Sequence, residues 1–415
     1  MDSSSKHQPV VIVGGGQAGF QVAASLRQAG FAEPLLIISD ENHLPYQRPP
    51  LSKSYLNDGA APESLHFRPQ EFLESNRIDF ENSTLVQAID RQAGKIVTSK
   101  GKNRSFSRLV IATGSRNRAL QVPGAQLKGV VGLRTIADAE YVRSLLLDAE
   151  DVVIVGAGFV GLELASHSAK RGHRVTVVEA AERAMQRVAS PQVSAVFARA
   201  HAQNGVMFRF RSGVVKLLGE AGHVSAVECD NGDIIRADLV LVGIGVIPNT
   251  ELAAEAGLPV NNGIVVDERL RTADPRISAI GDCANHPSRF ALNSVRIESV
   301  QNATDQARHV ALSLSNGTDE PYAAVPWFWS EQGKLRLQIV GLSHGVDHWV
   351  MRGEPDSHAF SVFGYRGSKL AVVESVGRPA DHVLARRLIG ADIDVPPEMA
   401  ADPSRDIKSL AWLAT

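Results

Sequence analysis

The sequence predicts an α/β protein with two Rossmann-like domains and a smaller C-terminal α+β domain. Two observations predict this fold: a strand, glycine turn and helix pattern occurs twice at a fixed offset, and short alternating strands follow residue 326. A chain of 415 residues is also too long for one ordinary hydrophobic core. We expect domains at residues 1–115, 116–245, 246–325 and 326–415, with the first and third forming one fold that the second interrupts.

The first glycine turn follows an apolar strand, Val10–Val13. Gly14, Gly16 and Gly19 have GxGxxG spacing, and a helical pattern of apolar residues resumes after them. The first glycine of such a turn allows the tight bend, the second lets the backbone approach a pyrophosphate, and the third permits close packing of helix on strand. Asp40 follows the next apolar strand, 21 residues after Gly19, where a carboxylate accepts hydrogen bonds from an adenosine ribose. The pattern predicts a dinucleotide site.

The same pattern returns 142 residues later, as expected for a duplicated nucleotide-binding fold. The strand Val152–Val155 leads into Gly156, Gly158 and Gly161, and the next strand ends at Glu179. A carboxylate at that position binds the ribose diol of NAD and repels the 2′-phosphate of NADP.

Around Glu179 the sequence favours NADH over NADPH. The next two residues, Ala180 and Ala181, supply no arginine to receive a 2′-phosphate. Arg183 is the nearby cation that leaves some use of NADPH open.

Composition excludes several other classes of function. The 43 basic and 45 acidic residues give a net charge of −2, which argues against a general nucleic-acid or membrane-surface binder. Cys229 and Cys283 lie far apart, and the histidines are scattered, so we expect neither a disulfide scaffold nor a metal site. No segment is apolar enough to span a bilayer, and residues 1–7 lack a hydrophobic signal core, so we expect a cytoplasmic protein.

A proline-rich loop follows the first nucleotide-binding unit. Its prolines, at positions 45, 49 and 50, oppose a helix until Ser52 can cap one. A stiff loop of this kind would hold Arg48 and Lys53 at fixed positions near the first nucleotide, although a solvated basic loop is the simpler alternative.

Three apolar strands end in small or acidic residues that suit a nearby cofactor. They lead into Thr113 and Gly114, into Gly245, and into Gly281 and Asp282. The remainder predicts an α+β domain, with Gly367–Ser368 as a hairpin turn and a helix near 380–389. The strands expected there are residues 334–342, 347–351, 359–364 and 370–376.

Over nearly its full length, the chain resembles the two-dinucleotide, FAD/NAD-linked flavoprotein reductases. Both glycine motifs, Ala112–Gly114 and Ala279–Asp282 carry this resemblance. The CxxxxC redox motif of the disulfide members is missing, so electrons are expected to leave directly from the flavin. The proline-rich loop, Leu133–Thr135, Arg296–Val300 and Pro326–Ser330 closely resemble the NADH-dependent ferredoxin reductases of bacterial cytochrome P450 and dioxygenase systems.

The resemblance implies roles for particular residues. Lys53 would place an ammonium near the flavin N5 and stabilise reduced flavin. Glu163 would pair with Lys53 and contact the nicotinamide carboxamide, unless it is an ordinary helix glutamate. Phe159, where many relatives carry tyrosine, would cover the flavin ring until nicotinamide displaces it. The FAD contacts implied are Gly14, Gly16, Ala18, Gly19, Asp40, Arg48, Lys53, Val86, Thr113, Gly114, Arg134, Gly281, Asp282, Val300 and Trp329, the last with core packing as its alternative. The NAD contacts are Gly156, Gly158, Gly161, Glu163, Glu179 and Gly245.

The function implied is hydride transfer from NADH to FAD, followed by single-electron transfer to a [2Fe-2S] ferredoxin that supplies a cytochrome P450 or related oxygenase. Arg308, Lys334 and Arg336 are candidates for a basic docking patch. Three alternatives stay open: a reductase of a quinone or monodehydroascorbate, a rubredoxin reductase, and a redox switch resembling apoptosis-inducing factor. The protein is expected to be a monomer or weak dimer.

Overall fold

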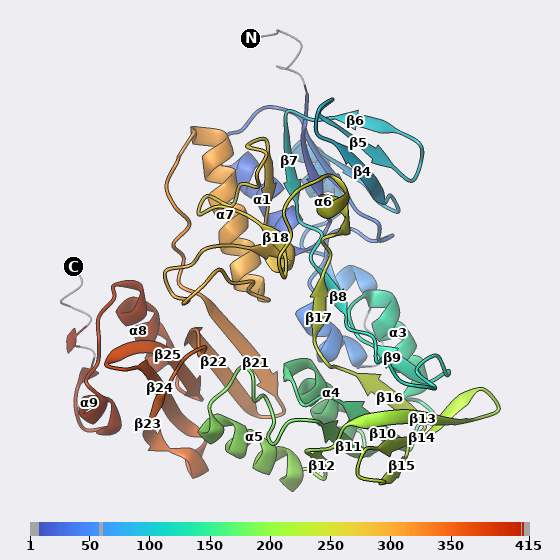
Figure 1. Cartoon of the computed structure of the whole chain (residues 1–415), viewed down its shortest axis with the longest axis vertical. Coiled ribbons are helices and arrows are strands. Elements are labelled where there is room, and N and C mark those ends of the chain that lie inside the picture. Colours follow the sequence, from blue (N-terminus) through green and yellow to red (C-terminus); the bar gives the residue numbers. More distant parts are fainter. Residues whose placement is uncertain (1–7, 58–60, 408, 411–415) are drawn as a thin grey trace. The chain divides into compact units, whose positions relative to one another are not determined.

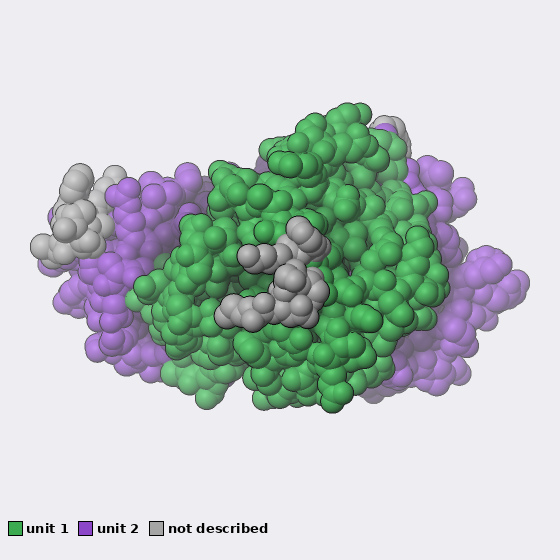
Figure 2. Space-filling view, turned by 90° about the horizontal axis from the view of Figure 1, so that it is seen from above, with its two compact units in different colours: residues 1–47, 62–116, 247–326 green, residues 48–61, 117–246, 327–415 purple. Residues whose placement is uncertain are grey.

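The computed structural model describes residues 8–57, 61–407 and 409–410 (Figure 1). The chain divides into two compact units, and Figure 2 colours the residues of each. Unit 1 consists of residues 1–47, 62–116 and 247–326, and unit 2 of residues 48–61, 117–246 and 327–415. None of the helices in the described ranges is long and apolar enough to cross a membrane.

Unit 1 is built on a parallel sheet in the order β19-β7-β1-β2-β3. Its central strands read as continuous Val, Ile and Leu because both faces are buried, as in doubly wound folds. Helices α1 and α7 pack against each other. The strands are β1 (Val10–Val13), β2 (Leu35–Ile38), β3 (Ile78–Glu81), β7 (Arg108–Ile111) and β19 (Ile277–Ala279), and the helices α1 (Gln17–Gln28), α2 (Gln70–Ser75), α6 (Glu251–Glu255) and α7 (Val300–Asn316).

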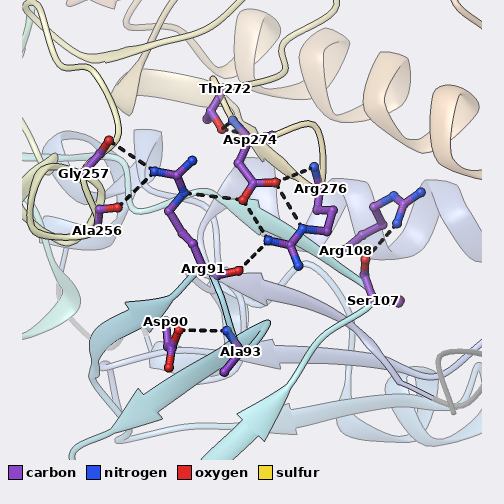
Figure 3. Close-up of polar contacts among 10 residues, drawn as sticks. All are labelled: Asp90, Arg91, Ala93, Ser107, Arg108, Ala256, Gly257, Thr272, Asp274 and Arg276. Atoms are coloured by element: carbon purple, nitrogen blue, oxygen red, sulfur yellow. Dashed lines mark hydrogen bonds and ion pairs between the residues drawn. The ribbon is translucent and has the colours of Figure 1, made fainter. Parts of the chain in front are cut away.

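An antiparallel sheet accompanies it, with strands β4 (Val86–Asp90), β5 (Lys95–Thr98) and β6 (Asn103–Ser105). The turn after β4 is fastened by a buried carboxylate (Figure 3). Asp274 accepts from Arg276 at 3.0 Å and from Arg91 at 3.4 Å, and Arg91 also reaches the carbonyl oxygens at the end of α6. The Arg276 guanidinium holds the pKa of Asp274 below its usual value.

Unit 2 repeats the doubly wound plan, with a parallel sheet in the order β12-β11-β10-β16-β9. An antiparallel sheet, β13-β14-β15, accompanies it. The strands are β9 (Val130–Gly132), β10 (Asp151–Val155), β11 (Arg174–Glu179), β12 (Met207–Phe210), β13 (Val214–Glu220), β14 (His223–Cys229), β15 (Ile234–Arg236) and β16 (Leu239–Val242). Its helices are α3 (Ile136–Leu145), α4 (Phe159–Lys170) and α5 (Pro191–Gln203).

Residues from 327 onward form the antiparallel sheet β21-β22-β25-β24-β23 within unit 2, with α8 packed on β22 and β25. The predicted hairpin at Gly367–Ser368 joins β24 to β25. The elements are β21 (Trp327–Gln332), β22 (Leu335–Gly341), β23 (His348–Glu354), β24 (Ala359–Arg366), β25 (Lys369–Val376), α8 (Pro379–Gly390) and α9 (Pro397–Ala401). The short strands β8 (Ser115–Asn117) and β17 (Val246–Pro248) pair where the chain crosses between the units, and β18 (Ile264–Val265) pairs with β20 (Ala284–Asn285).

The helix predicted to start at Ser52 is wrong. The prolines instead set two 3₁₀ turns, Pro49–Ser52 and Ser54–Leu56, and Ser52 ends the first of them. Its hydroxyl does not cap a helix because it donates to Glu163, 111 residues away in sequence.

Candidate functional site

The first glycine turn of unit 1 has the shape that a pyrophosphate requires. Gly14 has φ +117°, and a Cβ there would lie 2.2 Å from the carbonyl oxygen of Ala112, so only glycine fits. A Cβ at Gly19 would lie 1.9 Å from the oxygen of Gly14, which explains the close approach of α1 to β1. At Gly16 a Cβ would meet no atom within 4 Å. The N-terminus of α1 is therefore open to an anionic ligand.

Acidic side chains stand at two strand ends of the same unit. Asp40 is exposed just after β2. Asp282 follows β19, and its carboxylate accepts from the Ser115 hydroxyl at 2.8 Å. Next to it Gly281 has φ +76°, and a Cβ there would lie 3.2 Å from that of Ala18, so small residues at both positions also serve helix packing.

Asn249, a residue that sequence reasoning missed, forms hydrogen bonds with Thr113, next to Gly114. Asn249 donates its amide to the Thr113 carbonyl at 2.9 Å, and the Thr113 hydroxyl donates to the Asn249 carbonyl at 2.7 Å. Of the remaining predicted FAD contacts in unit 1, Val300 begins α7, and the side chain of Val86 is buried in the hydrophobic core.

The second glycine turn lies in unit 2 and repeats the first. Gly156 has φ +103°, and a Cβ there would lie 2.5 Å from the Gly243 oxygen, while one at Gly158 would meet only that oxygen, at 4.0 Å. Gly161 has the same close contact with Gly156 that Gly19 has with Gly14. Glu179 ends β11 and its carboxylate accepts from the N–H groups of Ala157 at 2.7 Å and Ala181 at 2.9 Å. This carboxylate is thus held at the mouth of the turn.

Two arginines near Glu179 differ in their surroundings. The Arg183 guanidinium donates to the carbonyl oxygens of Ala189 at 2.8 Å and Gln186 at 3.2 Å, and burial lowers its pKa. Both acceptors lie three to six residues further along the chain, so these bonds hold Arg183 against its own loop. Arg187 is exposed, and a Cβ at Gly245 would lie 3.5 Å from its Nη2.

Lys53 and the buried Glu163 form an ion pair in unit 2, the pairing that the resemblance implied. Lys53 Nζ lies 2.8 Å from Glu163 Oε2, and the side chain of Glu163 is only 5% exposed, against 25% for Lys53. Ser52 donates to Oε2 at 2.6 Å and Ser330 to Oε1 at 2.7 Å. The carboxylate is therefore held by donors from the proline-rich loop and from β21.

The hydrogen bonds continue beyond Ser330. Gln332 Nε2 lies 3.2 Å from the Ser330 hydroxyl, and Gln332 Oε1 lies 2.9 Å from His201 Nε2 on α5. Sequence reasoning missed Gln332 and His201 because they are far from Glu163 along the chain. The local signal that could have found Gln332 is its alternation with Ser330 on β21.

Aromatic and basic side chains complete the predicted set in unit 2. The ring of Phe159 stands 4.5 Å from that of Phe328, and Trp329 stands 5.6 Å from Trp327. Arg48 donates to the carbonyl of Arg134 at 2.8 Å.

The three docking candidates do not stand in one unit. Arg308 belongs to unit 1 and lies 3.7 Å from Asp305. Lys334 and Arg336 belong to unit 2, where both are exposed and Arg336 lies 3.7 Å from Glu331.

Cys229 and Cys283 are both free and buried, and burial raises the pKa of each thiol. Among the described residues, no group of His, Cys, Asp and Glu side chains gathers that could hold a metal ion.

Comparison with known proteins matches two successive segments of the chain to family models. Residues 8–307 match the family described as pyridine nucleotide-disulphide oxidoreductase, and residues 327–411 match a reductase C-terminal domain. Rhodocoxin reductase of Rhodococcus erythropolis is 48% identical over 399 residues, covering 96% of this chain and 93% of that protein. A rubredoxin-NAD(+) reductase of Pseudomonas putida is 38% identical and covers 89% of this chain and 96% of its own.

Solved structures resemble the whole chain. The ferredoxin reductase for the CYP199A2 system from Rhodopseudomonas palustris has a TM-score of 0.95 and 47% identity, covering 98% of this chain and 100% of that one. The reductase in a covalent putidaredoxin reductase–putidaredoxin complex has a TM-score of 0.93 and 39% identity, covering 98% and 99%.

Proposed function

This chain belongs to the pyridine nucleotide-disulphide oxidoreductase family, and we propose that it is an NADH-dependent, FAD-containing reductase of a [2Fe-2S] ferredoxin. The observation that carries the proposal is the Lys53–Glu163 pair, a cation fixed by a buried carboxylate, in a protein whose cysteines are free and buried. Bound FAD supplies the chemistry of such an enzyme, accepting a hydride and releasing electrons one at a time.

The chain's own residues bind and orient. In unit 1 the turn at Gly14 and Gly16 leaves the N-terminus of α1 open for the FAD pyrophosphate, and Asp40 offers an exposed carboxylate to its ribose. In unit 2 Lys53 brings positive charge that favours a reduced, anionic flavin, and Phe159 offers a flat ring for stacking.

Glu179 is the basis for proposing NADH as the donor. Its carboxylate is held at the glycine turn, where it would accept from a ribose diol and repel a 2′-phosphate. The guanidinium of Arg183, the one reservation from the sequence, donates to two backbone carbonyls, which supports this choice of donor.

The proposed acceptor is a small acidic ferredoxin that serves a cytochrome P450 or related oxygenase. Support comes from the relatives, which include the reductase of the CYP199A2 system and a reductase seen in complex with putidaredoxin. Lys334 and Arg336 stay candidates for steering such a partner, and Arg308 stays a separate one. A cytoplasmic monomer or weak dimer completes the proposal.

A rubredoxin is the second candidate acceptor, because a rubredoxin-NAD(+) reductase matches most of the chain. Stopped-flow mixing of the NADH-reduced protein with a panel of ferredoxins and rubredoxins decides between them. We expect fast reoxidation by a ferredoxin, slowed by added salt, with NADH-to-flavin reduction almost unchanged. Fast turnover of a quinone or monodehydroascorbate without any iron–sulfur protein would refute the proposal.

A further inference from the structure

A buried chain of hydrogen bonds runs from α5 through β21 to the carboxylate of Glu163. His201, Gln332 and Ser330 are its members, and they are 5%, 3% and 0% exposed. The successive contacts are 2.9 Å from His201 to Gln332, 3.2 Å from Gln332 to Ser330, and 2.7 Å from Ser330 to Glu163. Ser330 and Gln332 alternate along β21, so their side chains leave the same face of the strand.

The partners determine the direction of every bond in this chain. Gln332 Nε2 faces the Ser330 hydroxyl and the Met185 sulfur at 3.6 Å, and a thioether only accepts. The amide oxygen of Gln332 therefore faces His201, whose Nε2 must carry a hydrogen. Burial lowers the pKa of His201, which favours the neutral ring. The Ser330 hydroxyl oxygen accepts from Gln332, and its single hydrogen is donated to Glu163.

The contacts of the two Glu163 oxygens are unequal. Oε2 receives both Lys53 and Ser52, whereas the bond to Oε1 comes from Ser330. Turning the carboxylate about its last side-chain bond moves both oxygens, so the donor on Oε1 adds to the resistance that the two donors on Oε2 supply. Ser330 is thus the group that holds the second oxygen and completes the restraint on this carboxylate.

We propose that Ser330 and Gln332 are positioning residues for hydride transfer, holding the Glu163 carboxylate in the plane that fixes Lys53 and receives the nicotinamide carboxamide. The proposal rests on the proposed function. It assigns part of the catalytic geometry to β21, which lies in the segment matched by the reductase C-terminal model. This series of hydrogen bonds orients the Glu163 carboxylate and does not conduct protons, because the Gln332 amide could pass a proton only by becoming an imidic acid.

The test compares Ser330→Ala with Ser330→Thr, which keeps a hydroxyl. Each FAD-loaded variant is mixed with NADH in a stopped-flow instrument, and NAD⁺ is titrated separately to obtain its dissociation constant. We expect Ser330→Ala to slow hydride transfer about tenfold and to weaken NAD⁺ binding about threefold, with FAD content unchanged. Ser330→Thr should recover most of the rate.

A matched control is Ser361→Ala. Ser361 is also fully buried in unit 2 and lies 2.9 Å from a carboxylate oxygen of Asp381, outside this network. We expect it to lose stability as Ser330→Ala does, but to leave both the hydride-transfer rate and NAD⁺ binding unchanged. Because threonine adds a methyl group at a buried position, Gln332→Met is the second probe, and it should slow hydride transfer about threefold through the loosened Ser330.

The outcomes separate this inference from the proposed function. If wild-type protein is not bleached by NADH, the proposed function fails. If wild-type is bleached but Ser330→Ala and Gln332→Met match the Ser361→Ala control in rate and in NAD⁺ affinity, the positioning role alone is overturned.

Discussion

Replacing Lys53 by methionine should destabilise unit 2 more than replacing its partner Glu163 by glutamine. Methionine keeps the apolar stem of lysine but removes its charge. The Glu163 carboxylate, whose side chain is 5% exposed, then keeps only the hydroxyl donors of Ser52 and Ser330. Removing one partner of a buried pair costs about 3–5 kcal/mol, and two hydroxyl donors offset about 1–2 of it, so we expect a net loss of about 2–3 kcal/mol.

Replacing Glu163 by glutamine should cost less stability, because the lysine left without its partner is partly exposed. Glu163→Gln leaves a lysine whose side chain is 25% exposed and whose Nζ also lies 3.4 Å from the Pro49 carbonyl, so water and backbone solvate the charge. We expect a loss of about 1 kcal/mol. The double variant Lys53→Met/Glu163→Gln buries no charge and should be no less stable than Glu163→Gln, which gives a coupling energy of at least about 2–3 kcal/mol.

The assay is urea unfolding at pH 7.5 in excess FAD, with circular dichroism as the signal that monitors unfolding. The exposed pair Arg336–Glu331, at 3.7 Å in the same unit, is the matched control, and its cycle of Arg336→Met and Glu331→Gln should show coupling below about 0.5 kcal/mol. Equal losses for Lys53→Met and Glu163→Gln, or additive effects in the double variant, would refute the reasoning.

Three further predictions concern single carboxylates. Glu179→Ala should lower the preference for NADH over NADPH about tenfold, measured as the ratio of kcat/KM with ferricyanide, whereas the exposed Glu182→Ala should not change it. Burial raises the pKa of Glu374 to about 7, so between about pH 4.5 and 7 the carboxyl ionises in the unfolded chain but not in the folded one, and the folded state loses stability as the pH rises. Relative to wild-type, Glu374→Gln should gain about 3 kcal/mol across that window in urea unfolding, and a constant difference would contradict this. Arg276 lowers the pKa of Asp274, so the ionised carboxylate stabilises unit 1 above about pH 4, and this stabilisation is lost as the pH falls further. Asp274→Asn should melt earlier than wild-type at pH 7 and approach it in acid, and unchanged melting at pH 7 would exclude the effect.

Local patterns determined the framework of this protein. A glycine with positive φ is required wherever a strand turns sharply into a helix, and that requirement concerns only a few consecutive residues, so Gly14 and Gly156 could be read without knowing the fold. Alternation and turn residues likewise predicted the hairpin at Gly367–Ser368. The resemblance, and not spacing, supplied the pairing of Lys53 with Glu163.

Only the tertiary structure decided which groups hold the Glu163 carboxylate. Ser52 reads as a helix cap because the strongest signal for a hydroxyl is its neighbouring backbone, but the fold brings Glu163 within 2.6 Å and the hydroxyl donates there instead. Ser330 lies 167 residues from Glu163, and His201 lies 131 residues from Gln332. Asn249 reaches Thr113 across 136 residues. Such pairings follow from how the strands and helices pack, and a hydroxyl or amide carries no mark in the sequence of the distant partner it will bind.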